Sequence, residues 1–180
     1  MSGTDNDMLI LVDKNDNEIG TEQKLKAHKE GLLHRAFSIF IFNSEGKMLM
    51  TRRAKSKYHW GGFWSNACCS HPRQGEDLEH AAHRRLEEEL GFECELKELF
   101  SIVYKAKSEN GIYEHEYDHI FIGRYDGEVK ADPEETDEIR WVDPEELEKE
   151  IYDSTRFTPW FQIAFAKLVH MDIENLLNEE

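Results

Sequence analysis

Cysteines and long apolar runs are scarce in this sequence of 180 residues, and each shortage excludes a class of protein. The three cysteines are odd in number and two of them, Cys68 and Cys69, are adjacent, which argues against a disulfide framework and favours a reducing compartment. The longest apolar run, residues 37–42, is broken by Ser38 and is far too short to span a bilayer. No basic segment followed by an apolar one opens the chain. We therefore expect a cytoplasmic protein without a membrane partner.

Basic side chains are also in the minority, because 22 lysines and arginines face 38 aspartates and glutamates, for a formal net charge of -16. This balance disfavours nucleic acid or an anionic membrane as the main partner. A small anionic substrate is still possible, since salt screens exposed charges beyond about 8 Å and a local group of cations can outweigh the overall field. The length suits one domain over residues 1–180, of which 1–7 are expected to be flexible.

The pattern of apolar, turn and capping residues predicts strands mixed with a few helices and no strict alternation. We therefore expect an α+β fold with a mixed sheet. The expected strands span residues 9–12, 37–42, 47–53, 99–105, 113–125 and 139–142. The expected helices span 21–29, with Thr21 as cap, and 75–90, with further helices beginning at Pro144 and Pro159.

The helix expected over residues 75–90 has one apolar and one charged face. Leucine or alanine recurs at every fourth position from Leu78 to Leu90, which predicts a buried ridge. Arg85 and Glu89 lie together on a second face, with Glu88 alongside. Such a group of carboxylates suits a hard divalent cation, which prefers several oxygen ligands.

Several histidines and glutamates have spacings that suit a metal site. Residues two apart in a strand point to one face, so Glu114 and Glu116 can meet the same ion. His28 and His34 flank a glycine turn and can converge on it, and His71 would add a third imidazole. Three imidazoles and two carboxylates suit a borderline-to-hard divalent ion with octahedral geometry. The alternative is that all five are ordinary surface residues, because the sequence contains nine histidines.

Cys69 allows three interpretations from its context alone. It is a small buried side chain, half of a zinc knuckle whose second half is missing, or a reactive thiolate that needs positive charge or a metal nearby. Tyr104 and Trp160 are core residues or walls of a pocket, where an aromatic face stabilises a cation by about 0.5–2 kcal/mol. Four cations from separate segments form a phosphate pocket or are solvated surface charges: Lys24, Arg53, Lys57 and Arg85.

Residues 70–91 resemble the Nudix box, Gly-x5-Glu-x7-Arg-Glu-U-x-Glu-Glu-x-Gly, with two departures. Ser70 replaces the leading glycine, and Arg85 replaces the first glutamate of the Arg-Glu pair. Nudix pyrophosphohydrolases use that carboxylate in binding catalytic magnesium, so the arginine exchanges a metal ligand for a phosphate binder. The resemblance therefore disfavours hydrolysis by the usual route.

From about Leu9 to Leu168 the chain is similar to the type I isopentenyl-diphosphate Δ-isomerases, a branch of the Nudix superfamily. The matches are Ala27-His28, residues 33–38, 51–54, 64–66, 69–72 and 84–86, Tyr104, and residues 114–116 and 158–160. This resemblance implies a Nudix-type mixed sheet flanked by helices. It also implies an isomerase of isoprenoid biosynthesis that interconverts isopentenyl diphosphate and dimethylallyl diphosphate.

The resemblance assigns roles to individual positions. The implied ligands of one divalent ion (Mn²⁺, Zn²⁺ or Mg²⁺) are His28, His34, His71, Glu114 and Glu116, and the implied catalytic residues are Cys69, Glu116 and Tyr104. Glu89 would bind Mg²⁺ together with the substrate diphosphate. The implied substrate contacts are Lys24, Arg53, Lys57, Arg85 and Trp160. A small diphosphate is thus the expected partner, and the chain is expected to be a monomer or a weak homodimer.

Moving the double bond requires a proton added at C4 and another removed from C2. The intermediate resembles a tertiary carbocation, which an aromatic, water-excluding pocket would protect. We hypothesise that Glu116, relayed through Tyr104, protonates C4 and that Cys69 as a thiolate takes the C2 proton. Since a metal on Glu116 stabilises its anion, Tyr104 or water is an alternative donor. The rival functions are a Nudix pyrophosphohydrolase of a nucleoside diphosphate derivative and a non-catalytic metal-binding module.

Overall fold

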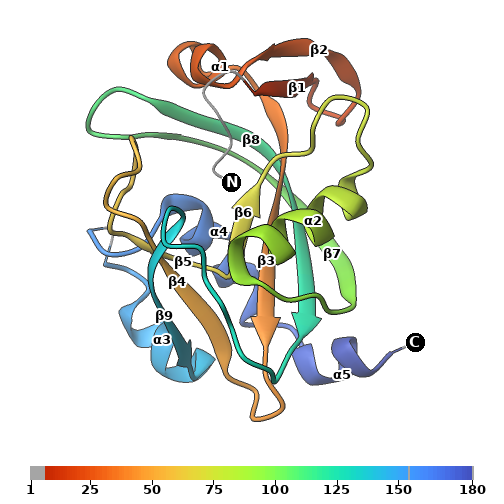
Figure 1. Ribbon diagram of the computed structural model, residues 1–180, viewed down its shortest axis with the longest axis vertical. Helices are drawn as coiled ribbons and strands as arrows, with labels where there is room; N and C mark the ends of the chain where they lie inside the picture. The colour runs from red at the N-terminus through yellow and green to blue at the C-terminus, as the bar shows by residue number, and fades with distance from the viewer. Residues whose placement is uncertain (1–6, 154, 180) are drawn as a thin grey trace.

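The computed structural model describes residues 7–153 and 155–179, and within these ranges the strands form one mixed sheet of nine (Figure 1). The central strand is β3, His34–Phe42, which runs antiparallel to β1, β4 and β6 and parallel to β8. The other strands are β1 Met8–Val12, β2 Glu18–Gln23, β4 Met48–Arg53, β5 Trp64–Ser65, β6 Cys68–Ser70, β7 Leu96–Lys107, β8 Tyr113–Arg124 and β9 Thr136–Val142. Outside the centre, β2 pairs with β1, β7 with β8, and β5 and β9 with β4.

Helices cover both faces of this sheet. Figure 1 shows α2, Leu78–Leu90, in front of β3 and α4, Pro159–Leu168, behind it. The remaining helices are α1 Lys24–Glu30, α3 Pro144–Glu150 and α5 Ile173–Asn178. None of the helices in the described ranges is both long and apolar enough to cross a membrane.

β3 contributes side chains to both cores because successive residues of a strand point to opposite faces. Phe37, Ile39 and Ile41 pack against α2, whereas Phe40 and Phe42 pack in the core that contains α3 and α4. Eight of the nine residues of β3 are buried, which explains why its sequence is an almost continuous apolar run.

α2 ends where the sequence predicts but begins at Leu78, three residues after the predicted start at Gly75. The Asp77 carboxylate caps its first turn by accepting from the backbone N–H groups of Glu79 and His80. Gly91 ends it in the left-handed conformation, at φ 72°. The ridge predicted from Leu78 to Leu90 faces the sheet, so the charged face of the helix is directed away from this core.

The prediction of a helix over residues 21–29 is wrong at its start. Thr21 does not cap a helix; it pairs with Ile10, and residues 18–23 form β2. This pairing uses the backbone groups that a longer helix would have needed, and α1 therefore starts at Lys24. The short elements β5, β6 and α5 were not predicted. The expected flexibility of residues 1–7 falls almost entirely on 1–6, which lie outside the described residues.

We predict that Leu86→Ala lowers the free energy of unfolding by about 2–5 kcal/mol, because the Leu86 side chain is fully buried between α2 and the sheet. Urea unfolding followed by circular dichroism measures the change. Glu87→Ala on the exposed face of α2 is the matched control and should change the free energy by less than about 0.5 kcal/mol. Equal effects of the two substitutions would show that α2 is not packed as described.

Candidate active site

The register of four neighbouring strands places four of the expected site residues on one face of the sheet. Glu116 on β8 lies opposite His34 on β3 and opposite Tyr104 on β7. On the other side of β3, Cys69 on β6 lies opposite Ser38. Paired residues of adjacent strands point to the same face, so these side chains form one continuous patch.

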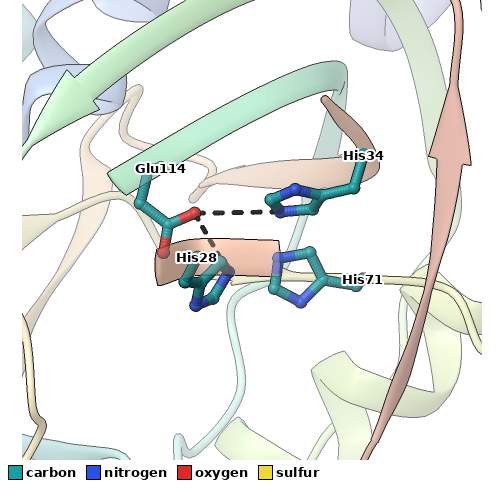
Figure 2. A group of neighbouring side chains, drawn as sticks. All are labelled: His28, His34, His71 and Glu114. Carbon is teal, nitrogen blue, oxygen red and sulfur yellow. Dashed lines mark ion pairs between the residues drawn. The ribbon is translucent and has the colours of Figure 1, made fainter. Parts of the chain in front are cut away.

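Three imidazoles and two carboxylates meet at the end of this patch. His28 from α1, His34, His71 and Glu114 each offer a ligand atom, and these four atoms lie within 4.8 Å of one another (Figure 2). Glu114 Oε2 is 3.6 Å from His28 Nε2 and 3.9 Å from His34 Nε2. Glu116 Oε1 completes the group at 3.4 Å from His34 Nε2 and 2.9 Å from His71 Nε2.

The partners of His34 and Glu114 orient them toward this centre. His34 Nδ1 must carry its proton, because it donates to the Leu32 carbonyl oxygen at 2.9 Å and a carbonyl only accepts. Nε2 of His34 therefore presents a lone pair to the carboxylates. On the far side of Glu114, His59 Nε2 hydrogen-bonds Oε1 and leaves Oε2 directed at His28 and His34.

The environment keeps His28, His59 and His71 unprotonated at neutral pH. Burial, reinforced by the charges of the neighbouring histidines, strongly lowers the pKa of His28, and burial lowers the pKa of His71 to about 4. Burial also lowers the pKa of His59 to about 2. His28 Nε2, His34 Nε2 and Glu114 Oε2 are buried without a hydrogen-bond partner among the described residues. Since buried polar atoms without partners are costly, this donor set fits a divalent cation.

A cavity of about 730 Å³ opens beside these ligands and contains most of the residues selected from the sequence. His34 is the exception, because its side chain is fully buried behind Glu114 and Glu116. The expected residues that line the cavity are Lys24, His28, Arg53, Lys57, Cys69, His71, Arg85, Glu89, Tyr104, Glu114, Glu116 and Trp160. The structure thus brings the expected site residues together.

The surroundings of Cys69 on balance favour its protonated form. Its Sγ–H donates to Asn66 Oδ1 at 3.1 Å, and Ser38 Oγ lies 3.5 Å from the sulfur. Ser38 in turn donates to the fully buried Asp118 at 2.8 Å. Burial and then the negative charge of Asp118 raise the pKa of Cys69 to about 12. The resting side chain in these surroundings is therefore a neutral thiol, and the thiolate of the sequence-based hypothesis would form during the reaction.

Glu116 and Tyr104 form the second protic group of the cavity. Tyr104 Oη donates to Glu116 Oε2 at 2.6 Å. Burial and then the charge of Glu116 raise the pKa of Tyr104 well above its usual value, so the phenol keeps its proton. Burial alone would also raise the pKa of Glu116, but the adjacent imidazoles of His34 and His71, the latter hydrogen-bonded to Glu116 Oε1 at 2.9 Å, outweigh it and hold this pKa well below its usual range. The pair therefore consists of a carboxylate and a phenol that donates to it.

The four cations expected to contact the diphosphate all line this cavity, and two of them are paired with carboxylates. Arg85 pairs with Glu88 at 2.7 Å and with Glu89, and Lys57 pairs with Glu135. Arg53 lies 5.5 Å from the ring centre of Trp160. Such a group of cations provides the local positive charge that the net charge of the chain conceals.

Sequence reasoning missed several residues that position this site. Tyr58 hydrogen-bonds His28 Nδ1 at 2.5 Å, and His59 holds Glu114. Asp118 had a usable signal, since it continues the alternation of Glu114 and Glu116 along one face of β8. No sequence pattern singled out Tyr58 and His59, because the loop that contains them has no hydrophobic periodicity.

Comparisons with known proteins agree with this geometry. A family model described as the NUDIX domain matches residues 32–161. Isopentenyl-diphosphate Delta-isomerase 2 of Photorhabdus laumondii is 47% identical over 169 residues, which are 93% of this chain and 96% of that protein. The isopentenyl-diphosphate Delta-isomerase of Burkholderia multivorans is 52% identical over 160 residues, which are 88% and 91% of the two chains. The chain belongs to the isopentenyl-diphosphate Delta-isomerase family.

Solved structures show that the fold of this family member is the Nudix fold. The crystal structure of DR0079 from Deinococcus radiodurans superposes with a TM-score of 0.75 at 20% identity, covering 89% of this chain and 98% of that one. A MutT protein from Methanosarcina mazei gives a TM-score of 0.63, also at 20% identity, and covers 79% and 95% of the two chains. The expected α+β class, a Nudix-type mixed sheet flanked by helices, is confirmed.

We predict that His34→Ala weakens the binding of Mn²⁺ or Zn²⁺ by roughly 100-fold, because it removes one ligand from a site in which the others stay in place. Competition against a metal-binding dye measures the affinity. His115→Ala is the matched control, since His115 lies between Glu114 and Glu116 on β8 but its ring contacts the Gly31 carbonyl oxygen on the opposite face. Unchanged affinity in the His34 variant would exclude this residue as a ligand.

Proposed function

We propose that this isomerase interconverts isopentenyl diphosphate and dimethylallyl diphosphate, with Cys69 and Glu116 transferring the two protons. The names of its relatives, which are 40–52% identical, support the substrate and the reaction. The observation that carries the residue roles is a single cavity that holds a thiol, a carboxylate and an adjoining group of cations. The cations suit a diphosphate, and the two protic groups suit an allylic proton shift.

The protonation states of the resting site support opposite roles for the two groups. Cys69 carries a proton and Glu116 lacks one, so in one direction of this reversible reaction the thiol donates and the carboxylate accepts. In the other direction Glu116 donates and the thiolate accepts, as the sequence-based hypothesis has it. Tyr104, hydrogen-bonded to Glu116 at 2.6 Å, can relay that proton. Neither direction requires a group from outside the cavity.

Tyr104 and Trp160 place aromatic rings in the lining of the same cavity. Trp160 packs edge-on against Trp60 at 5.2 Å between ring centres, and Tyr104 lies 6.2 Å from Trp160. Their faces would stabilise a carbocation by about 0.5–2 kcal/mol each and would exclude the water that captures it. The position of Trp160 thus supports the role that the resemblance implies for it, which is to cover the reacting carbons.

Two divalent ions are part of this proposal. His28, His34, His71, Glu114 and Glu116 would hold one, which the resemblance implies is Mn²⁺, Zn²⁺ or Mg²⁺, and Glu89 would hold Mg²⁺ with the diphosphate. At the first site a bound ion would supply positive charge that offsets the two adjacent carboxylates. At the second it would offset the charge of the diphosphate. A cytoplasmic location and a monomeric or weakly dimeric state remain predictions from the sequence.

The rival pyrophosphohydrolase is less well supported. Arg85 occupies the place of a Nudix-box glutamate, and its guanidinium pairs with Glu88 and Glu89. The relatives with the higher identities are named as isomerases, whereas the solved Nudix structures, at 20% identity, show only the fold.

We expect that the protein, incubated with isopentenyl diphosphate and Mg²⁺ in deuterated water, forms dimethylallyl diphosphate with deuterium in the new methyl group. The reason is that the proton added at C4 exchanges with solvent through the protic groups of the site. NMR and mass spectrometry detect the label, and a phosphate assay runs in parallel. Release of phosphate from nucleoside diphosphate derivatives without any allylic isomer would establish the hydrolase instead.

We predict that Cys69→Ala and Glu116→Gln each lower the isomerisation rate by about 10²- to 10⁴-fold, the usual contribution of a positioned acid or base. Both variants should remain folded by circular dichroism. Cys94→Ala is the matched control for loss of a thiol, because Cys94 packs in the core beside α2, away from the residues that line the cavity. Near-normal turnover by either variant removes that residue from the mechanism.

A further inference from the structure

Glu135, in the loop before β9, is an unexpected carboxylate among the expected diphosphate contacts. Its side chain pairs with Lys57 Nζ and lies 3.4 Å from Arg85 Nη2. The backbone of the same residue is fixed as well, since its carbonyl oxygen accepts from Ala54 N–H at 2.9 Å. The carboxylate is therefore held in the cavity both by its main chain and by two cations.

These ion pairs are better shielded from water than ordinary surface pairs. The side chain of Glu135 is 10% exposed, that of Lys57 19% and that of Arg85 8%. Solvent and salt screen such charges weakly, so the Coulomb attraction between them is stronger than in exposed pairs. Burial opposes ionisation of Glu135, but Lys57, Arg85 and Lys24 outweigh it and lower its pKa. Glu135 is thus an anion at neutral pH.

Lys57 and Arg85 are thus each matched by a carboxylate. Lys57 and Arg85 are two of the expected diphosphate contacts, and Glu135 together with Glu89 supplies two negative charges against them. A free diphosphate that approached Lys57 and Arg85 would have to displace Glu135 and would be repelled by both carboxylates. A magnesium-bound diphosphate brings two positive charges that offset this repulsion.

We propose that Glu135 is a specificity-determining residue that makes the cavity select magnesium-bound diphosphates over free anions. Its carboxylate acts as an internal counter-anion for Lys57 and Arg85. A free diphosphate that displaced this carboxylate would have to break both of its ion pairs. The inference rests on the proposed function only in taking a diphosphate as the ligand.

Isothermal titration calorimetry with inorganic pyrophosphate, with and without Mg²⁺, tests this role directly. Glu135→Gln keeps the shape of the side chain and removes its charge. Without Mg²⁺ we expect this variant to bind pyrophosphate at least about tenfold more tightly than the wild type, because one nearby negative charge is gone. With Mg²⁺ the two proteins should differ by less than about threefold, since the cation already offsets that charge.

Glu134→Gln is the matched control. Glu134 is the preceding residue, lines the same cavity and is exposed, so its charge is screened. This variant should bind pyrophosphate within about twofold of the wild type under both conditions. A similar gain in affinity in both variants would show a general effect of net charge and overturn the proposal.

Two further outcomes would also overturn it. Unchanged binding of free pyrophosphate by Glu135→Gln would show that Glu135 opposes no anion. A loss of affinity confined to magnesium pyrophosphate would show that Glu135 is a magnesium ligand instead. The wild type supplies a measurement independent of any variant, since pyrophosphate alone should stabilise it against heat far less than magnesium pyrophosphate does, and equal stabilisation would contradict the proposal.

The calorimetry also separates this inference from the proposed function. It requires no turnover, so a protein that fails to isomerise isopentenyl diphosphate but shows the expected pyrophosphate affinities would refute the isomerase and retain the role of Glu135. An active isomerase whose Glu135→Gln variant binds free pyrophosphate like the wild type would retain the proposed function and refute the role of Glu135.

Discussion

The pairing register of β3 with β8 is the constraint on which the site depends. Because His34 lies opposite Glu116, and Glu116 opposite Tyr104, three chemical groups from three strands point to one side of the sheet. A shift by one residue would turn a whole strand's side chains to the other face. The alternating apolar residues of β3 prevent this shift, since each set has its own core, one with α2 and one with α4. The packing of the molecule thus fixes the positions of its reactive groups.

Much of this arrangement could be predicted from the sequence, because it follows from local patterns. The two-residue spacing of Glu114 and Glu116 placed both on one face of a strand, and the glycine turn between His28 and His34 let them converge, as the structure shows. Gly31 ends α1 in the left-handed conformation, at φ 66°, where an added Cβ would lie 3.1 Å from Lys105 Cε. The many dispersed matches to the type I isopentenyl-diphosphate Δ-isomerases then indicated the family.

The rest could not be predicted, because it depends on contacts between distant segments. Nothing near His59 in the sequence indicates that it holds Glu114, which lies 55 positions away. Glu135 appeared to be one of 38 acidic residues until the fold placed it on Lys57 and Arg85. The protonation of Cys69 likewise depends on burial and on Asp118, neither of which is visible in a list of neighbours along the chain. Electrostatics inside a protein is a property of the folded structure.

The alternation of side chains along β6 separates two adjacent cysteines. Cys68 packs in the core with α2, whereas Cys69 packs with the core on the other face and lines the cavity. A disulfide between the two would need one of them to rotate out of the pleat, which would break the pairing of β6 with β3. While this strand is formed, the tandem thiols cannot act as a local redox couple, and an electrophile that enters the cavity meets a single sulfur.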